Sequence, residues 1–285
     1  MQAIKQHNLD WTISAKTSWW NLNLKEWWLY RHLLGRLIRR DFLLNYQQTM
    51  LGPAWILLQP ILTLFVFVIV FGGILRIETG NTPQVLFFLS GIVLWNFFNE
   101  SFLAISFVFL HNAEIYTKVY FPRLIIPLAY LISQAIRFVI QFVLLILVWV
   151  YFAVMQGASF NITPYLLLVP VVAILIGMLS FSAGIIFSIL TGKYRDLGNV
   201  VHLGLRLLMF VTPIFYPASY IPDKIRWVAD LNPLSSLFEI FRLGILGEGS
   251  FTTNGFIYSC VFTFVLFILS AMIFSKQSDK LIDIV

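Results

Sequence analysis

Charged residues and cysteine are scarce in this sequence. Only 11% of its 285 residues are Asp, Glu, Lys or Arg, whereas soluble domains average about 25%. Cys260 is the only cysteine and lies inside an apolar run, which excludes an intrachain disulfide and a cluster of thiolate ligands. The first roughly 50 residues contain no short apolar segment like that of a signal peptide, so we expect no cleavable signal.

Motifs for catalysis and nucleotide binding are also missing. There is no G-x-x-x-x-G-K-[ST] loop, no H-E-x-x-H and no G-x-S-x-G, and the four histidines are scattered. The nearest glycine-rich stretch, Gly244 to Gly249, lacks the lysine that holds phosphates. We therefore predict no catalytic, cofactor or metal residues in this chain, and no enzyme activity of the chain on its own.

Long apolar runs dominate what remains, since 59% of the residues are hydrophobic and 17% aromatic. About 20 apolar residues cross the roughly 30 Å of a bilayer core as a helix, and lipid accepts only helices or closed barrels. The sequence therefore predicts an all-α polytopic membrane protein. Its net charge of +6 comes from basic residues beside apolar runs, which indicates anionic lipid rather than nucleic acid as the partner.

Six transmembrane helices are predicted, and the fifth contains Thr212-Pro213 and Pro217, so we expect it to be broken and short. A cytoplasmic segment, 1–53, precedes the transmembrane domain, 54–275, and a tail, 276–285, follows it. The predicted spans are about 54–75, 85–110, 124–155, 164–190, 199–217 and 255–274.

The basic residues are distributed unequally between the two sides of these spans. Thirteen Lys and Arg residues fall before the first span, in the second-to-third and fourth-to-fifth connections and in the tail, against four in the opposite connections. Because cytoplasmic loops carry the excess of Lys and Arg, both termini are predicted to be cytoplasmic.

Two further segments are predicted to form helices that do not span. Residues 27–50 mix Trp27, Trp28 and aliphatic residues with arginines, which favours an amphipathic helix in the cytoplasmic interface over a soluble helix. Residues 232–246 begin with a capping Asn232-Pro233 pair. Their apolar residues share one face, and Ser235, Ser236, Glu239 and Arg242 share the other, so we expect a short re-entrant or outer-interface amphipathic helix.

Polar stripes cross two of the spans. Asn96, Asn99 and Glu100 share one face of the second, and Ser133, Gln134, Arg137 and Gln141 share one face of the third. Ionisable residues in a span mark either a structural pair or a pathway. Two hypotheses follow: a buried Glu100–Arg137 ion pair that joins the helices, or an aqueous path lined by both stripes.

Aromatic residues adjoin these polar groups. Trp95, Phe97 and Phe98 flank Asn96, and Phe215, Tyr216 and Tyr220 accompany the broken fifth span. Aromatic faces beside polar groups suit sugar rings, whereas the alternative interpretation is an interfacial aromatic belt.

Four segments resemble ABC-2 type transporter permeases, in particular exporters of polysaccharides and polyol phosphates. The first, LIRRDFLLNYQQTMLGPAWILLQ at 37–59, has the basic interfacial helix ending in Arg-Asp and an aromatic, then Tyr, a polar pair, Leu-Gly and Trp. Residues 114–123 are similar to the K-x-x-F-P connection of that family, and 193–196 to its loop containing Arg-Asp. Thr212 to Tyr216 followed by Asn232-Pro233 resembles the broken fifth span and the helix after it.

The resemblance implies a homodimeric permease bound to two copies of a separate ATPase subunit, which would bind ATP and Mg. The complex would export a lipid-linked polysaccharide, such as O antigen, capsule or teichoic acid, across the inner membrane. Short segments that mix charged and aromatic residues would contact the ATPase: Glu114, Ile115, Tyr116, Lys118, Tyr120, Phe121, Pro122, Arg123, Lys193, Tyr194, Arg195 and Asp196.

The remaining candidate residues belong to the substrate. Three arginines of the interfacial helix, Arg36, Arg39 and Arg40, could hold a lipid pyrophosphate, although ordinary positive-inside anchoring explains each equally well. The candidates for the translocation path are Trp95, Asn96, Phe98, Asn99, Glu100, Arg137, Gln141, Phe215 and Tyr216.

Three other functions remain open at this stage. The first is export of a drug or small lipid by the same kind of permease. The second is a membrane-embedded glycosyltransferase or polymerase, but Asp223, Asp230, Glu239 and Glu248 in the outer loop form no recognisable catalytic arrangement. The third is a passive channel, which would need no partner.

Overall fold

The computed structural model describes residues 30–80, 82–118, 121–155, 163–194 and 196–282, and these ranges contain helices and connecting segments without a strand. The predicted all-α class is therefore confirmed in this part of the chain. The helices are α2 (Arg31–Tyr46), η1 (Gly52–Ala54), α3 (Trp55–Phe67), η2 (Val68–Ile74), α4 (Gln84–Ser106), α5 (Val108–His111), α6 (Ala113–Lys118), α7 (Ile125–Met155), η3 (Pro164–Leu167), α8 (Leu168–Lys193), α9 (Leu197–Val211), η4 (Ala218–Tyr220), α10 (Asp223–Leu231), α11 (Pro233–Leu246) and α12 (Thr253–Ile282).

Five helical stretches in the described ranges are long and apolar enough to cross a membrane, not the six that the sequence predicts. They are Gly52–Ile74, Gln84–Ser106, Ile125–Met155, Pro164–Lys193 and Thr253–Gln277. The fifth predicted span contains only the 15 residues of α9, which is too short for a bilayer crossing. Helix α9 ends at Val211 because Pro213 cannot continue a helix.

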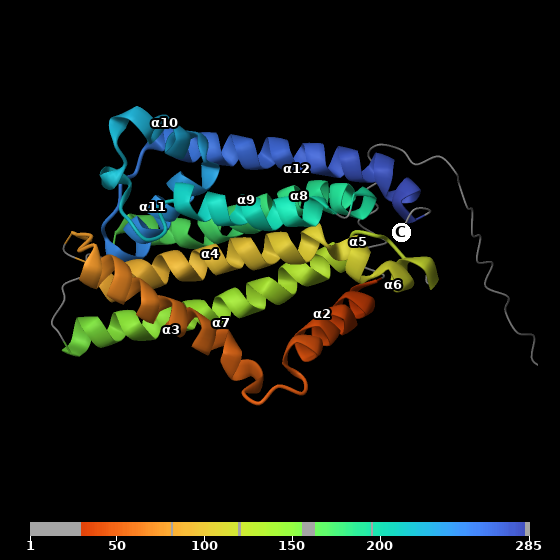
Figure 1. Ribbon diagram of the computed structural model, residues 1–285, viewed down its shortest axis with the longest axis horizontal. Coiled ribbons are helices and arrows are strands. Elements are labelled where there is room, and N and C mark those ends of the chain that lie inside the picture. Colours follow the sequence, from red (N-terminus) through yellow and green to blue (C-terminus); the bar gives the residue numbers. More distant parts are fainter. Residues whose placement is uncertain (1–29, 81, 119–120, 156–162, 195, 283–285) are drawn as a thin grey trace, which may run out of the picture.

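The direction of the chain nevertheless alternates as in a six-pass protein. Figure 1 shows α5, α6 and the end of α12 at one end of the molecule, with α2 nearby, and α10 at the opposite end. We call these the α6 end and the α10 end. Helix α9 runs from the α6 end toward the α10 end, and the chain completes this fifth pass without a regular helix through 212–217.

One predicted boundary needs correction. The second span ends at Ser106 rather than at 110, because Phe107 leaves the helical conformation before the short α5 begins. The segment predicted as the tail is helical as far as Ile282, because α12 continues past the apolar stretch. Residues 1–29 lie outside the described residues, so the prediction for Trp27 and Trp28 remains a prediction, while the rest of that segment forms α2.

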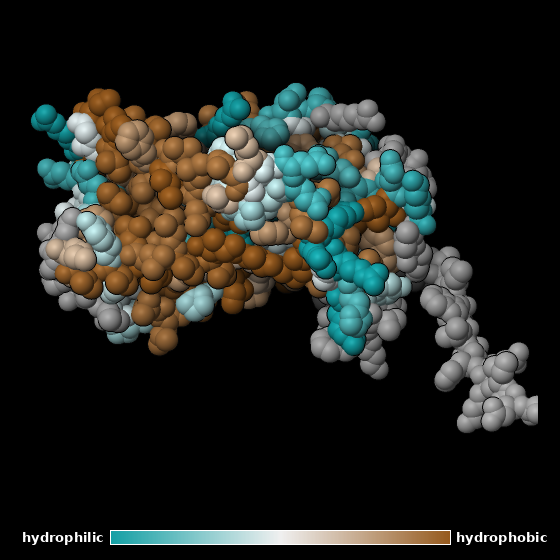
Figure 2. Space-filling view, turned by 90° about the horizontal axis from the view of Figure 1, so that it is seen from below, coloured by the Kyte–Doolittle hydropathy of each residue, from teal (hydrophilic) through white to brown (hydrophobic). Residues whose placement is uncertain are grey.

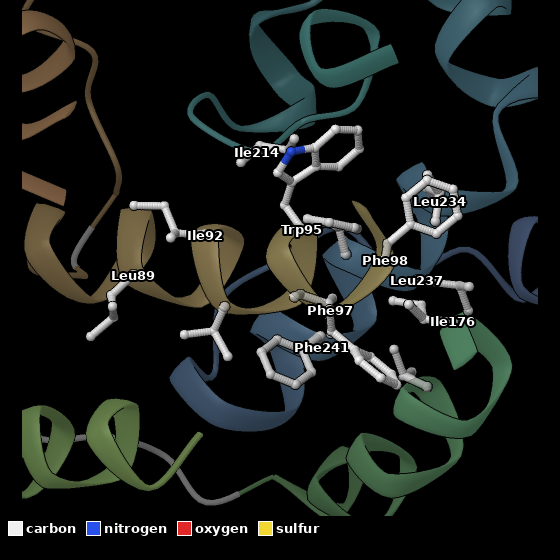
Figure 3. Packing of buried hydrophobic residues seen from close by; sticks show 14 of the residues in the cluster. Leu89, Ile92, Trp95, Phe97, Phe98, Ile176, Ile214, Leu234, Leu237 and Phe241 are labelled. Carbon is white, nitrogen blue, oxygen red and sulfur yellow. The ribbon is translucent and has the colours of Figure 1, made fainter. Parts of the chain in front are cut away.

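Helix α4 occupies the centre of the molecule. In its most apolar 18-residue stretch 78% of the residues are buried, compared with 11% in the corresponding stretch of Gly52–Ile74 and 17% in those of α7 and α12. Its side chains pack against α8, α11 and the segment after α9, as Figure 3 shows for Trp95, Phe98, Phe241 and Ile214. A second, smaller cluster joins α2, α6 and the start of α7 at the α6 end.

The outer surface of the helices is apolar between two polar ends. A broad hydrophobic region covers the middle of the molecule in Figure 2, and hydrophilic residues gather toward both ends. Exposed aliphatic and aromatic side chains on α3, α7, α9 and α12 make up much of the apolar surface, among them Phe65, Leu147, Leu207, Phe264 and Ile268. Such a surface is suited to lipid tails.

Helix α11 departs from the expected amphipathic arrangement. As predicted, Asn232 caps it by accepting a hydrogen bond from the Leu234 amide (3.1 Å), and Pro233 opens it. Gly247 ends it in the left-handed conformation (φ 74°). However, Glu239 and Arg242 are as buried as the apolar face. The expected polar outer face is therefore wrong, because α4, α8, α12 and η3 surround this helix.

Candidate functional site

The two polar stripes meet inside the molecule. The Asn96 side chain of α4 donates to Gln141 Oε1 of α7 (3.4 Å), and Gln141 Nε2 donates to the carbonyl oxygen of Ile56 in α3 (3.1 Å). Both polar side chains are half-buried. The two stripes therefore touch through Asn96 and Gln141, and the first span also contributes to this contact.

Arg137 pairs with Asp41 of α2 rather than with Glu100. Its Nη2 lies 3.2 Å from Asp41 Oδ2, with 14% of the arginine side chain and 11% of the aspartate side chain exposed. The guanidinium also lies 5.4 Å from the centre of the Tyr46 ring. Glu100 instead accepts a hydrogen bond from its neighbour Asn99 (3.0 Å). The hypothesis of a Glu100–Arg137 ion pair is wrong for this structure, because α2 packs against α7 and supplies the nearer carboxylate.

Most aromatic candidates for the path belong to the core of the chain. Trp95, Phe98 and Phe215 are buried, and the Phe215 ring stacks on that of Phe71 with 4.4 Å between centroids. Tyr216 alone among the aromatic candidates is half-buried. Its hydroxyl donates to the carbonyl oxygen of Phe210 (2.7 Å), so it caps the end of α9.

Helix α6 presents charges outward and aromatic residues inward. Glu114 and Lys118 are exposed and form an ion pair at 3.1 Å. Tyr116 and Phe121 are buried against one another in the smaller cluster. Burial also raises the pKa of the Tyr116 phenol, whose hydroxyl donates to the carbonyl oxygen of Arg123 (3.1 Å). The two aromatic residues therefore anchor this segment, and Glu114, Thr117 and Lys118 are its exposed residues in the described part of α6.

The remaining predicted contact residues vary in exposure. Ile115, Pro122 and Arg123 are half-buried. At the end of α8, Lys193 and the following Tyr194 are exposed, with the lysine ammonium group 5.1 Å from the tyrosine ring centre. Asp196 is exposed as well, while Tyr120 and Arg195 lie outside the described residues.

The three candidate arginines of α2 have different surroundings. Arg36 and Arg39 are exposed. Arg40 Nη2 donates to the Oδ1 atom of Asn112 (2.8 Å), and Asn112 also donates to the hydroxyl of Tyr130 (3.0 Å). Arg40 thus ties α2 to the junction of α5 and α6, which leaves Arg36 and Arg39 as the accessible pair.

Sequence reasoning missed two groups of this interior. Asp41 was assigned to an interfacial surface, and Arg242 to the polar face of an outer helix. Arg242 instead donates from inside the molecule to the carbonyl oxygens of Pro213 and Ile214. The Thr212-Pro213 break could have indicated a buried donor such as Arg242, because an interrupted helix leaves backbone carbonyls that require hydrogen-bond donors.

Comparisons with known proteins agree with this architecture. Residues 32–246 match the family described as ABC-2 type transporter. The chain is 28% identical over 256 residues to the O-antigen export system permease protein RfbA of Klebsiella pneumoniae, covering 88% of this chain and 94% of the relative. A second Klebsiella pneumoniae protein of that name is 31% identical, with 74% and 78% covered. The polysialic acid transport protein KpsM of Escherichia coli is 23% identical, with 86% and 93% covered. This chain therefore belongs to the ABC-2 type transporter family, among the permeases of polysaccharide exporters.

Proposed function

We propose that this chain is the permease subunit of an ABC exporter that moves a lipid-linked polysaccharide across the inner membrane. Two copies of the chain associate with two copies of a separate ATPase subunit, and both termini lie in the cytoplasm. The observation that carries this proposal is the similarity to O-antigen export permeases along 88% of the chain. The names of the relatives favour a glycan such as O antigen or capsule over a drug or small lipid.

In this proposal ATP hydrolysis by the ATPase subunit drives export, because the sequence of this chain has no loop that could hold nucleotide phosphates. The ATPase binds ATP and Mg and contacts the exposed charges of the α6 end. The exposed residues proposed for this contact are Glu114 and Lys118 on α6, Lys193 at the end of α8, and Tyr194 and Asp196 after it. Buried Tyr116 transmits the contact by holding α6 against the helices.

The glycan is proposed to follow the polar stripes. Asn96, Glu100 and Gln141 are half-buried in a region where lipid accepts no polar group. Their two amides and one carboxylate could form hydrogen bonds with the hydroxyl groups of a sugar chain. A closed apolar cavity would instead suit a drug. Arg36 and Arg39 on the exposed side of α2 would bind the pyrophosphate of the lipid carrier through charge-assisted hydrogen bonds.

Reconstitution with the ATPase tests this function. Vesicles that contain the complex and a lipid-linked glycan should transfer the glycan to the opposite leaflet when ATP is added. A variant ATPase without its phosphate-binding lysine should transfer none. Equal transfer without ATP would identify a passive pathway, and no transfer of any lipid-linked glycan by an assembled, ATP-hydrolysing complex would refute the proposal.

Single-cysteine labelling tests the sidedness. With Cys260→Ser as background, a cysteine at Lys118 should react with an impermeant reagent only after the cell is opened. A cysteine at Asp223 of α10 should react in intact cells. Reaction of the Lys118 position from outside would contradict the cytoplasmic assignment of the α6 end.

A further inference from the structure

The interruption of the fifth pass leaves a series of backbone carbonyls inside the molecule. The last carbonyls of a helix have no partner within it, and buried carbonyls require donors. The hydroxyl of Tyr216 reaches the carbonyl oxygens of Phe210 (2.7 Å) and Val211 (3.3 Å). The carbonyl oxygen of Thr212 accepts a hydrogen bond from the Ile214 amide (2.7 Å). Those of Pro213 and Ile214 receive no donor from their own segment among the described residues.

Arg242 supplies both missing donors from α11. Its Nη1 lies 2.7 Å from the carbonyl oxygen of Pro213, and its Nη2 lies 2.5 Å from that of Ile214. Only 1% of the arginine is exposed. A planar guanidinium can hold two acceptors at once, which a lysine ammonium on a flexible stem cannot reproduce with the same geometry.

Helix α4 and a carboxylate of α11 itself also contact this guanidinium. The ring of Phe87 in α4 lies 3.8 Å below it, and Glu239 of the same α11 helix lies 3.5 Å from Nη1. Glu239 in turn accepts hydrogen bonds from the amide and hydroxyl of Ser250, just before α12. Gly91 of α4 makes the approach possible, because a Cβ atom there would collide with the Ile214 carbonyl and the guanidinium.

We propose that Arg242 is a positioning residue for transport, which joins the interrupted end of α9 to α11 so that the two move as one unit. This inference rests on the proposed export function. Separating α9 from α11 would leave a buried charge beside Phe87 and two buried carbonyls without donors, which is strongly unfavourable. Tyr216 and Phe215 are held by the same unit, so Arg242 determines where these path candidates lie.

Other hydrogen bonds lie around this unit. The side chain of Asn232, between α10 and α11, donates to the Thr212 hydroxyl (2.8 Å) at a buried position. The hydroxyl of Tyr220 accepts a hydrogen bond from the exposed amide of Glu78 (3.0 Å). At the end of α10, the hydroxyl of Tyr258 donates to the carbonyl oxygen of Leu231 (2.8 Å) at an exposed position.

Two substitutions separate positioning from simple charge balance. Arg242→Met removes both donors and leaves Glu239 without a counter-charge, while Glu239→Gln added to it removes the unpaired charge. In the permease–ATPase complex, the double variant should insert and assemble better than Arg242→Met alone. It should still hydrolyse ATP within about twofold of wild type, yet export at least about tenfold less glycan per assembled complex, a loss that corresponds to about 1.4 kcal/mol. Arg226→Met, at an exposed arginine of α10, is the matched control and should export normally.

Amide hydrogen exchange of the complex provides a readout that does not depend on transport. Residues 208–216 should stay protected in wild type with and without ATP, and lose protection in the double variant. Wild-type export by the double variant, or unchanged protection of 208–216, would overturn the proposed role of Arg242. A fall in export that merely matches the loss of assembled complex would also overturn it. If the wild-type complex exports no glycan, the proposed function fails, whereas the exchange experiment still tests the clamp.

Discussion

The contact between α2 and α7 allows a quantitative test of this structure. Asp41 and Arg137 are both largely buried, and the 3.2 Å separation of their charged groups makes each the natural counter-ion of the other. Asp41→Asn would leave the guanidinium with a neutral partner and the ring of Tyr46. Removing one partner of a fully buried pair costs about 3–5 kcal/mol, and the residual exposure of this pair lowers the expected loss to about 2–3 kcal/mol.

The assay is equilibrium unfolding of the purified permease in mixed detergent micelles, with a double-mutant cycle. Asp41→Asn and Arg137→Gln should each destabilise strongly, while the double variant should lose much less than the sum of the two. A coupling energy of about 2 kcal/mol is expected, within the range for residues in direct contact. The exposed Glu114–Lys118 pair is the matched control, and Glu114→Gln should cost about 0.5 kcal/mol or less.

A second cycle distinguishes the two possible partners of Arg137. Glu100→Gln combined with Arg137→Gln should be nearly additive, within about 0.5 kcal/mol, as expected for residues that share no contact. A larger coupling to Glu100 than to Asp41 would refute the arrangement of α2 on α7. Equal and small couplings to both would show that α2 does not bind α7 at this position.

Two further predictions concern packing. Phe121→Asp should lower the free energy of unfolding by about 3–5 kcal/mol, because it buries a carboxylate in the smaller cluster. A stable Phe121→Asp protein would contradict the assigned burial. Glu114→Ala, at the exposed face of α6, should keep wild-type stability but weaken stimulation of the partner ATPase. Gly91→Ala should destabilise by about 1–3 kcal/mol, because its Cβ would collide with the Ile214 carbonyl oxygen. Gly204→Ala, where no atom lies within 4 Å of the added Cβ, should be neutral or stabilising in the same unfolding assay, and equal effects at both glycines would argue against the close approach of α4.

The boundaries of the long helices were predictable because hydropathy and proline act locally. The spans beginning near 54, 85, 124, 164 and 255 all correspond to helices that start within about three residues of the expected position. The fifth span was expected to be broken at Thr212-Pro213, and α9 ends one residue before this pair. The capping signals at Asn232-Pro233 likewise marked the start of α11.

The partners of the buried charges were not predictable in this way. Helical periodicity assigns Glu100 and Arg137 to polar stripes on the second and third spans, but it carries no information about which helices are neighbours. Asp41 became the partner because α2 packs on α7, a contact between residues 96 positions apart. The same limitation assigned Arg242 to an outer face, since helical periodicity identifies a polar face and not what covers it.

The amino-acid sequence by itself determined that this protein lies in a membrane, where most of its long helices begin, and that it belongs with polysaccharide export permeases. Each of these follows from short-range physics or from motifs: apolar length against bilayer thickness, the missing amide of proline, and residue patterns at fixed spacing. The tertiary structure alone decided that α4 and α11 are central, that Tyr116 and Phe121 face inward, and that Asp41 and Arg242 neutralise groups far away in the chain. Those outcomes depend on which helices pack together, and a buried charge or carbonyl is satisfied by whatever donor or acceptor that packing brings within reach.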